Sequence, residues 1–395
     1  MKDRKKILIT SFDMEIGGVE RSLINLLDSF DYKKYSLDLL LYNHSGEFMP
    51  LIPKNTNLLS ENKVYSTIRK GIGALVKSGY YNLALSRLMA KYQSKLGERK
   101  GLDDTYQMQL MWKYCNKNFS KVSENYDVAI SYLWPHNFVA EKVNAKKKIA
   151  WIHTDYSKIS PHREMDLKIW QKYNHIIGVS QECVNSFLKV YPSLKDKCLV
   201  MENITSPEFI HTMSESFEVT KYQKNDFNLL SVARFSYAKG IDQGIEALKI
   251  LRERGYKDIK WYVVGYGGDE EQLKELVKKY SLENDFIFLG KQSNPYPYMK
   301  ECDLYVQPSR YEGKAVTVIE AQILNKPVLI TDYPTAKSQI VNGEDGEITE
   351  LSVKGIADGI EKFYKNRELL KKYEINCKNK SFENIKELEK LYELF

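Results

Sequence analysis

The sequence has little of what marks secreted, metal-binding or membrane-spanning proteins. Its 395 residues include only five cysteines, which are scattered and never form a CxxC pair or lie beside histidines at ligand spacing. This argues against a disulfide framework or a zinc site and favours a cytoplasmic protein. No apolar run reaches the length of a bilayer span, and the basic start MKDRKKILITSF lacks the apolar region of a signal peptide. Any membrane contact is therefore expected to be peripheral.

Glycine and proline, at 21 and 11 residues, are too few for a fibrous or disordered chain, and the composition is that of globular domains. A length of 395 residues exceeds what one ordinary core supports and predicts two medium domains. A polar stretch without periodicity, residues 203–226, indicates a linker between them. We therefore expect domains at residues 1–205 and 206–378, followed by a helix at 379–395 that packs back toward the first domain.

Short apolar runs alternate with helical patterns in both halves of the chain. The runs are KKILIT, SLDLLLY, YDVAISYL, KKIAWIH and HIIGVS in the first half, and FNLLSVAR, IKWYVVG, FIFLG, LYVQPS and KPVLITD in the second. This rhythm predicts a parallel sheet in each domain. The expected fold class is α/β, with two doubly wound Rossmann-like domains that bind ligands at the carboxyl ends of their strands, in a cleft between the domains.

Positive charge is concentrated in one region of the first half. Residues 1–200 carry 31 Lys and Arg against 20 Asp and Glu, whereas the remainder carries 28 against 32. Much of the excess lies in residues 63–100, where nine basic residues face one acid, Glu98, among apolar residues at helical spacing. This predicts a basic helical insertion at 63–118, which is either a solvated surface or a docking region for anionic lipid headgroups. No nucleic-acid partner is expected.

The strongest local signal is SRYEGKAVTVIEAQ, in which a loop after a strand leads into a helix near Ala315 or Val316. Backbone N–H groups at a helix N-terminus suit a phosphate or sugar hydroxyls. Two carboxylates, Glu312 and Glu320, lie on either side of that helix start and could grip two hydroxyl-bearing parts of one ligand. Alternatively, Glu312 caps the helix and Glu320 is merely solvated.

Two further patterns follow strands of the second half. In SVARFSYAKGID, Arg234 ends a strand and Lys239 follows five residues later, before a helix that starts near Asp242. Two cations at the carboxyl end of a strand fit a diphosphate, although both could simply be solvated. In VVGYGGDEEQL, Gly265 begins a GxGG turn, which is weak evidence for a dinucleotide site and is equally explained by a tight turn between strand and helix.

The first half offers candidates in the same position relative to its strands. Gly17 and Gly18 lie at the start of the first helix, where an anion is favoured. His153 ends the strand KKIAWIH and is a candidate for ligand contact, with His136 and Asp155 weaker candidates nearby. The sequence contains no Ser-His-Asp, HExxH, Walker or DxD pattern, so neither a metal nor a cofactor is expected.

These landmarks in combination resemble family 4 of the retaining glycosyltransferases, which have the GT-B fold, and in particular enzymes of bacterial capsule and exopolysaccharide assembly. The match runs through nearly the whole chain, from the two glycines after the first strand to the E-x7-E segment. The sequence departs from the commoner EGFG or EGLP form of that segment at Lys314 and Ala315, which leaves the donor sugar open.

The resemblance implies roles for the catalytic candidates. Arg234 and Lys239 correspond to the clamp on the donor diphosphate, and His153 to the histidine that contacts the transferred sugar. Glu312 would bind hydroxyls of that sugar, and Glu320 the ribose.

The resemblance also implies a set of donor contacts. Lys291, which follows FLG, would lie by the nucleobase, and backbone from Gly313 to Thr317 would lie near the phosphates and sugar. The implied donor-binding residues are Gly17, Gly18, Gly265, Lys291, Gly313, Lys314, Ala315, Val316, Thr317 and Glu320.

We therefore expect a retaining, metal-independent hexosyltransferase that moves a hexose or N-acetylhexosamine from a UDP-sugar to a saccharide or polyprenyl-diphosphate-linked glycan in cell-surface polysaccharide synthesis. The basic region 63–100 would contact the inner face of the membrane. Two alternatives stay open: a nucleotide-sugar epimerase of the same architecture, and a non-catalytic subunit that binds sugar nucleotides.

Overall fold

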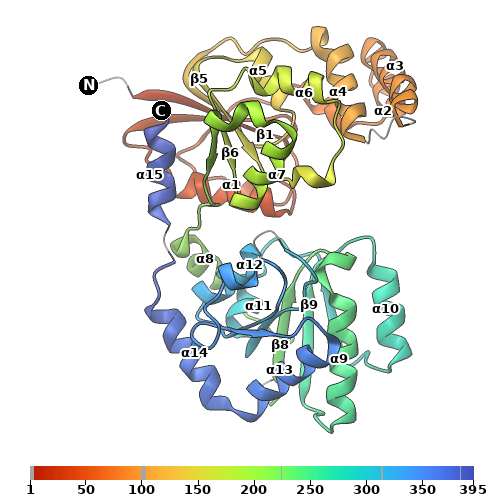
Figure 1. The fold of residues 1–395 in the computed structure, drawn as a ribbon, viewed down its shortest axis with the longest axis vertical. Helices are drawn as coiled ribbons and strands as arrows, with labels where there is room; N and C mark the ends of the chain where they lie inside the picture. The colour runs from red at the N-terminus through yellow and green to blue at the C-terminus, as the bar shows by residue number, and fades with distance from the viewer. Residues whose placement is uncertain (1–3, 99–103, 224, 313–314, 383) are drawn as a thin grey trace. The chain divides into compact units, whose positions relative to one another are not determined.

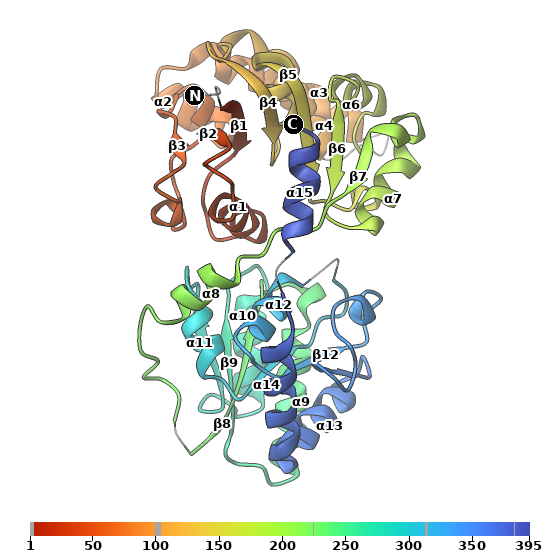
Figure 2. The ribbon, with the colours of Figure 1, turned by 90° about the vertical axis from the view of Figure 1, so that its left-hand side faces the viewer.

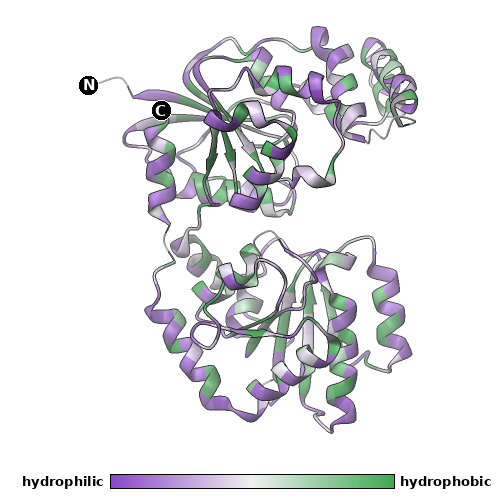
Figure 3. Ribbon diagram, in the orientation of Figure 1, coloured by the Kyte–Doolittle hydropathy of each residue, from purple (hydrophilic) through white to green (hydrophobic). Residues whose placement is uncertain are grey.

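A computed structural model describes residues 4–98, 104–223, 225–312, 315–382 and 384–395. The chain forms two compact units, one of Met1–Thr205 with Asn384–Phe395 and the other of Ser206–Glu383 (Figure 1). Each unit contains its own parallel sheet, with seven strands in the first and six in the second. These two Rossmann-like sheets confirm the predicted α/β class with two Rossmann-like domains. Figure 3 shows that the strands are the most apolar parts of each unit.

The sheet of the first unit has the strand order β3-β2-β1-β4-β5-β6-β7. Its central strands are buried on both faces, as in Ile7, Leu8 and Ile9, because helices cover parallel sheets on both sides. The strands are β1 (Lys5–Ser11), β2 (Tyr35–Leu41), β3 (Asn57–Leu58), β4 (Asn125–Ser131), β5 (Asn144–Ile152), β6 (His175–Gly178) and β7 (Cys198–Val200). The helices are α1 (Gly18–Asp28), α2 (Ile72–Lys77), α3 (Tyr81–Glu98), α4 (Asp104–Cys115), α5 (His136–Lys142), α6 (Arg163–Trp170), α7 (Gln181–Val190) and α15 (Ile385–Glu393).

The sheet of the second unit has the order β10-β9-β8-β11-β12-β13. Its strands are β8 (Phe227–Val232), β9 (Ile259–Val264), β10 (Phe286–Gly290), β11 (Leu304–Gln307), β12 (Val328–Thr331) and β13 (Glu347–Thr349). Its helices are α8 (Pro207–Ser214), α9 (Ile241–Glu253), α10 (Glu270–Lys279), α11 (Tyr296–Glu301), α12 (Val316–Ile323), α13 (Val353–Lys365) and α14 (Arg367–Asn379).

Strand order reverses once in each sheet. In the first unit the reversal falls between β1 and β4, which pair in parallel from Ile7 with Val128 to Thr10 with Ser131. In the second it falls between β8 and β11. Connections leave the sheet in opposite directions at such a point, so the carboxyl ends of these strands are where an open parallel sheet leaves room for a ligand.

Residues 203–226 were expected to be the linker between the domains, but from Ser206 they belong to the second unit and contain α8, so this prediction is wrong in part. The Ser206 hydroxyl accepts a hydrogen bond from the Phe209 N–H, which caps α8, and Pro207 occupies the first helical position. Ile210 is fully buried in the core of the second unit. The helix is short, with few apolar residues, so periodicity did not reveal it.

The C-terminal helix α15 packs against the first unit. Tyr392 stacks on Tyr35 with ring centroids 4.8 Å apart, and its hydroxyl accepts a hydrogen bond from the Asp31 N–H. Leu391 is fully buried. Figures 1 and 2 both show α15 alongside this unit, although α14, which precedes it, belongs to the other.

Helices α2, α3 and α4 lie together at one edge of the first unit, within the predicted basic insertion 63–118 (Figure 1). Within the described parts of the chain, no helix is both long enough and apolar enough to cross a bilayer.

Candidate functional site

The reversal point of the second sheet brings together two residues that lie far apart in the sequence. Lys239 lies in the loop between β8 and α9, and Glu312 in the loop between β11 and α12. The Lys239 ammonium is 2.7 Å from Glu312 Oε1 and 2.6 Å from Oε2. Because β8 and β11 are neighbours in the sheet, their following loops meet, and two predicted catalytic residues form one ion pair.

Glu312 is held in place by polar side chains from β11 and from the loop that follows it. Its Oε1 also accepts hydrogen bonds from Ser309 Oγ at 2.6 Å and from Gln307 Nε2 at 3.0 Å. Gln307 is itself oriented, because its oxygen accepts from the hydroxyls of Tyr305 and Thr317. The Glu312 side chain therefore does not cap α12, which contradicts the alternative that it serves only as a helix cap.

The pair keeps free bonding capacity toward a ligand. An ammonium has three N–H donors, and two of those of Lys239 point at Glu312. Glu312 Oε1 is saturated by three donors, whereas Oε2 accepts only from Lys239 among the described residues and can accept one hydroxyl more. Lys239 can thus bind a phosphate oxygen while Glu312 accepts from a sugar hydroxyl.

Arg234 lies on the same loop as Lys239, and its side chain is exposed. No hydrogen-bond or ion-pair partner of Arg234 occurs within the described part of the chain. The loop packs closely against the turn after β9. A Cβ on Gly265 in that turn would lie only 1.9 Å from the Ala233 carbonyl oxygen. Gly267 likewise passes within contact of Phe235. Packing therefore requires these two glycines, which favours the tight-turn interpretation of the GxGG pattern.

Glu320 is completely buried on α12, and its carboxylate accepts a hydrogen bond from the Tyr296 hydroxyl at 2.8 Å. The alternative that Glu320 is solvated is therefore wrong. A ribose contact stays a prediction, and it requires Glu320 or Tyr296 to move, because no surface of Glu320 reaches solvent in this structure.

The remaining donor candidates are spread along the carboxyl edge of the same sheet. Ala315 precedes α12 and Val316 and Thr317 open it, whereas the candidates Gly313 and Lys314 lie outside the described residues. Lys291 follows β10, with its ammonium 5.2 Å from the centre of the Tyr266 ring, which follows β9.

In the first unit, hydrogen bonds link His153 through Tyr132 to helix α1, beside the reversal point of the sheet. The Nε2–H of His153 donates to the Tyr132 carbonyl at 3.1 Å, and the Tyr132 hydroxyl bonds to Ser22 on α1 at 2.6 Å. This tautomer leaves Nδ1 as an acceptor. Burial lowers the pKa of His153 to about 4, and burial with the neighbouring His153 lowers that of His136 to about 3, so both imidazoles are neutral at neutral pH.

The amino end of α1 is more acidic than expected. A Cβ on Gly17 would lie 2.2 Å from the Glu20 carboxylate, so this glycine makes room for that side chain, whereas the space around Gly18 is open. Burial raises the pKa of Glu20, and that of Asp13, which pairs with Arg69 at 3.3 Å. A carboxylate of the chain itself therefore occupies the position where an anion was expected.

Comparison with known proteins adds to this geometry. Residues 213–380 match the family model described as Glycosyl transferases group 1. The second unit is thus similar to the group 1 glycosyl transferases. The match spans nearly all of that unit, including Arg234, Lys239, Glu312 and Glu320.

Three curated relatives are similar to this chain over about half of their own length. An uncharacterized glycosyltransferase of Methanocaldococcus jannaschii is 30% identical over 50% of this chain and 51% of its own. The capsular polysaccharide biosynthesis glycosyltransferase CapM of Staphylococcus aureus is 28% identical over 48% of this chain and 55% of its own. An N-acetylgalactosaminyltransferase of Campylobacter jejuni, named for a diphospho-undecaprenol acceptor, is 26% identical over 40% of this chain and 43% of its own.

Solved structures resemble the entire chain. Anabaena HepE, crystallised with UDP and glucose, covers 99% of both chains with a TM-score of 0.64 and 17% identity. A mutant of Staphylococcus aureus TarM, crystallised with Fondaparinux, alpha-GlcNAc-glycerol and UDP, covers 99% of both chains with a TM-score of 0.68 and 15% identity. At this identity the likeness shows the fold, which confirms the predicted GT-B type.

Sequence reasoning missed the residues that position Glu312. Tyr305, Gln307 and Ser309 alternate along LYVQPS, and a buried glutamine in an apolar strand was a signal that could have found them. Ser22 and Tyr132 were also missed, since nothing local distinguishes them from core residues. In the described residues no group of three or more His, Cys, Asp or Glu is arranged to hold a metal ion.

Proposed function

We propose that this chain is a retaining glycosyltransferase that moves a hexose or N-acetylhexosamine from a UDP-sugar to a saccharide or polyprenyl-diphosphate-linked acceptor in cell-surface polysaccharide synthesis. The observation that carries the proposal is the Lys239–Glu312 pair at the reversal point of the second sheet, with Arg234 exposed on the same loop. Two cations and one carboxylate at the carboxyl edge of a parallel sheet suit a sugar nucleotide, which presents a diphosphate beside hydroxyls.

The proposed reaction needs no protein nucleophile. The bond between the anomeric carbon and the diphosphate breaks, and a bond to the acceptor oxygen forms on the same face of the sugar. The acceptor's hydroxyl proton passes to the leaving diphosphate, whose growing negative charge is stabilised by Arg234 and Lys239. Cations of the protein take the place of a metal ion in this scheme, so activity is expected in the presence of EDTA.

Glu312 and His153 are proposed to hold the transferred sugar. Glu312 Oε2 has capacity for one hydroxyl, and its orientation is fixed by Ser309. The neutral imidazole of His153 can accept a hydroxyl through Nδ1. Positioning of this kind accounts for much of the barrier reduction in group transfer, because the reacting atoms are held close together before reaction.

The relatives support the donor and acceptor classes. HepE and TarM were crystallised with UDP, and the Campylobacter relative is named for an undecaprenyl diphosphate acceptor. CapM is named for capsular polysaccharide biosynthesis. A UDP-sugar donor and a lipid-linked glycan acceptor, met at the inner face of the cell membrane, are therefore our proposal for this chain.

The donor is tested by thermal unfolding of the full chain with UDP-, GDP- and ADP-sugars. A ligand at about 100 times its dissociation constant stabilises the folded state by about 2.7 kcal/mol. We expect stabilisation by UDP-sugars alone, and a null result with all three classes would contradict the donor site. Product analysis then separates transfer from the alternatives. Conversion of the donor without acceptor would indicate an epimerase, and binding without turnover a non-catalytic subunit.

A further inference from the structure

Helix α3 carries a second apolar face that no described part of the chain covers. Seven of the fifteen large hydrophobic side chains exposed in the described structure lie in the 21 residues from 76 to 96, so their clustering is a property of this region. Six of them are on α3 and are between 48% and 73% exposed. They are Tyr81, Leu85, Leu88, Met89, Tyr92 and Leu96.

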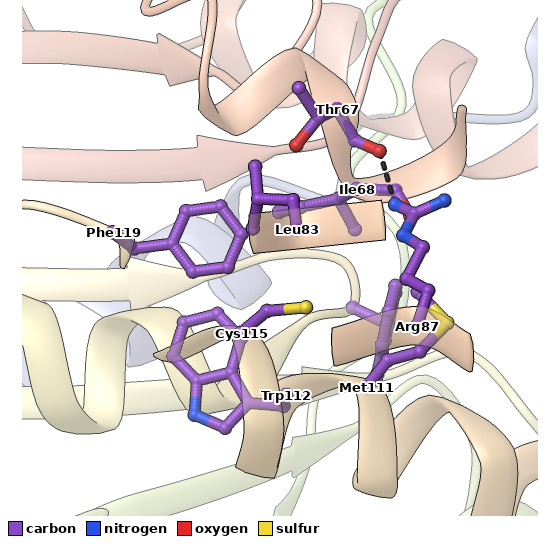
Figure 4. Close-up of a pocket in the computed structure, with 9 residues that line it drawn as sticks. Thr67, Ile68, Leu83, Arg87, Met111, Trp112, Cys115 and Phe119 are labelled. Atoms are coloured by element: carbon purple, nitrogen blue, oxygen red, sulfur yellow. Dashed lines mark hydrogen bonds between the residues drawn. The ribbon is translucent and has the colours of Figure 1, made fainter. Parts of the chain in front are cut away.

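The exposed side chains form a stripe along the helix. At about 100° per residue they fall within an arc of about 100°, which is one continuous face. The opposite side of α3 carries Leu83, Ala84 and Ala90, which are buried. Figure 4 shows Leu83 and Arg87 on the inner side of α3, where they line a pocket together with Met111 and Trp112 of α4. The inner face of α3 therefore accounts for its packing, and the outer stripe does not.

Arg87 explains how α3 is fixed with the stripe outward. Its buried guanidinium donates to the carbonyls of Thr67 and Ile68, at the end of the short 3-10 helix Tyr65–Arg69. A cation is favoured at the carboxyl end of a helix, where carbonyls lack partners. The bond to Thr67 is drawn in Figure 4.

Positive charge borders the stripe. Lys91 and Lys95 are exposed on α3, on one flank of the apolar arc, and Lys77 is exposed on the adjoining helix α2. From residue 63 to 118 the sequence has eleven Lys and Arg against three acids, a net charge of +8, whereas the whole chain has +7. The acids are Glu98 at the carboxyl end of α3, Asp104 at the amino end of α4, and Asp103, which lies outside the described residues.

We propose that this outer face of α3 docks on the surface of an anionic lipid bilayer. An apolar stripe bordered by lysines matches an interface in which acyl chains lie beside negative headgroups. The 18 residues of α3 span about 27 Å and lie flat on such a surface, with Tyr81 and Tyr92 at the level of the headgroups. A polar protein surface would match the lysines but not the leucines.

The test is cosedimentation of the full chain with vesicles of phosphatidylcholine, with and without phosphatidylglycerol. We expect binding to the anionic vesicles that weakens with salt, and little binding to the neutral ones. Lys91→Gln with Lys95→Gln should weaken binding about twentyfold, since each lysine near an anionic surface contributes about fivefold. Leu85→Gln, Leu88→Gln and Tyr92→Gln together should weaken it by about tenfold or more while keeping helix propensity.

Matched control variants change the same residue types elsewhere. Lys278→Gln with Lys279→Gln removes two exposed lysines of α10, and Ile375→Gln with Leu351→Gln removes two exposed apolar side chains of the second unit. Both should bind vesicles like the wild type, and all variants should keep the wild-type circular dichroism and melting temperature. Equal loss in the controls would overturn the proposal.

Two further outcomes would also overturn it. One is a wild-type chain that does not bind anionic vesicles. The other is a concentration-dependent dimer in analytical ultracentrifugation that the leucine variant abolishes while vesicle binding is unaffected, which would make the stripe an interface between copies. The assay contains no sugar nucleotide, so its result is independent of the proposed transferase activity.

Discussion

Replacing Lys239 with alanine is expected to damage both the stability and the activity of this protein, and the structure separates the two effects. Lys239 contacts both oxygens of Glu312, whose side chain is only 6% exposed, whereas that of Lys239 is 27% exposed. Among the described residues, Lys239 is the only cation in contact with this carboxylate, and the substitution removes it. It also removes the proposed partner of the leaving diphosphate.

The stability effect lies between two known limits. Exposed ion pairs contribute about 0.2 to 1 kcal/mol, and breaking a buried pair costs about 3 to 5 kcal/mol. Glu312 keeps its hydrogen bonds from Ser309 and Gln307, and Lys239 is partly exposed. We therefore expect a loss of about 1 to 2 kcal/mol, which for a unit of this size is a fall in melting temperature of about 2 to 8 °C.

The activity effect should be larger. A group that stabilises charge on an oxygen in the transition state is worth about a hundredfold to a thousandfold in kcat. We expect Lys239→Ala to lower kcat by this factor, measured as release of UDP from the donor that thermal unfolding identifies. The donor KM should change less, because in the proposed site Arg234 would still bind the diphosphate and Glu312 the sugar.

A second substitution distinguishes the two effects. In Lys239→Ala with Glu312→Gln the unpaired negative charge is gone, so the melting temperature should return toward that of the wild type while turnover stays low. The reasoning would be refuted by a Lys239→Ala enzyme with kcat within about tenfold of the wild type, or by a double variant that regains turnover together with stability.

Three other outcomes follow from the structure. Gly265→Ala should destabilise the second unit by about 1 to 3 kcal/mol in a denaturant titration and weaken donor binding, because the new Cβ would lie 1.9 Å from a carbonyl oxygen. Gly268→Ala is the control and should be neutral in the same titration, because nothing lies within 4 Å of a Cβ added there. Lowering the pH from about 7 to about 5 should destabilise the first unit in urea by up to about 2 kcal/mol for each of His136 and His153. Their folded pKa values, about 3 and about 4, lie below the unfolded value, so the stability present above about 6.5 is lost as the pH falls. Tyr392→Ala should lower the stability of the first unit by about 2 to 3 kcal/mol in urea, since it removes a stacked ring and a hydrogen-bond acceptor.

Local patterns were sufficient to predict most of the secondary structure around the site. The strand FNLLSVAR is β8, and the helix expected near Asp242 begins at Ile241. Gly240, with φ of +64°, lies at that boundary. A Cβ at this position would lie 2.0 Å from the Pro308 carbonyl oxygen, so only a residue without a side chain lets the two loops come this close. Strand ends and helix starts depend on neighbours in the sequence, which is why they could be predicted.

The contacts between these elements could not be predicted in the same way. Lys239 and Glu312 are 73 residues apart, and they meet because β8 pairs with β11 rather than with the strand that follows β9. Strand order depends on how the whole sheet assembles, and a single sequence carries no local signal for it. The burial of Glu320 could not be predicted either, because its carboxylate accepts a hydrogen bond from the hydroxyl of Tyr296 on another helix.

For helix α3, hydrophobic periodicity predicts more burial than the structure shows. Its apolar residues lie on two sides, the inner one with Leu83 and the outer one with Leu85 and Leu88, so hydrophobic spacing alone describes a helix buried all round. The lysines contradict that description, because Lys91 and Lys95 cannot be buried unpaired at acceptable cost. Charge placement therefore indicates that one apolar side faces outward, and only the packing of the other side on α4 shows which one it is. An apolar face kept outward beside lysines is costly in water and favourable at an anionic lipid surface, so the sequence of α3 is better explained by a membrane interface than by solvent exposure.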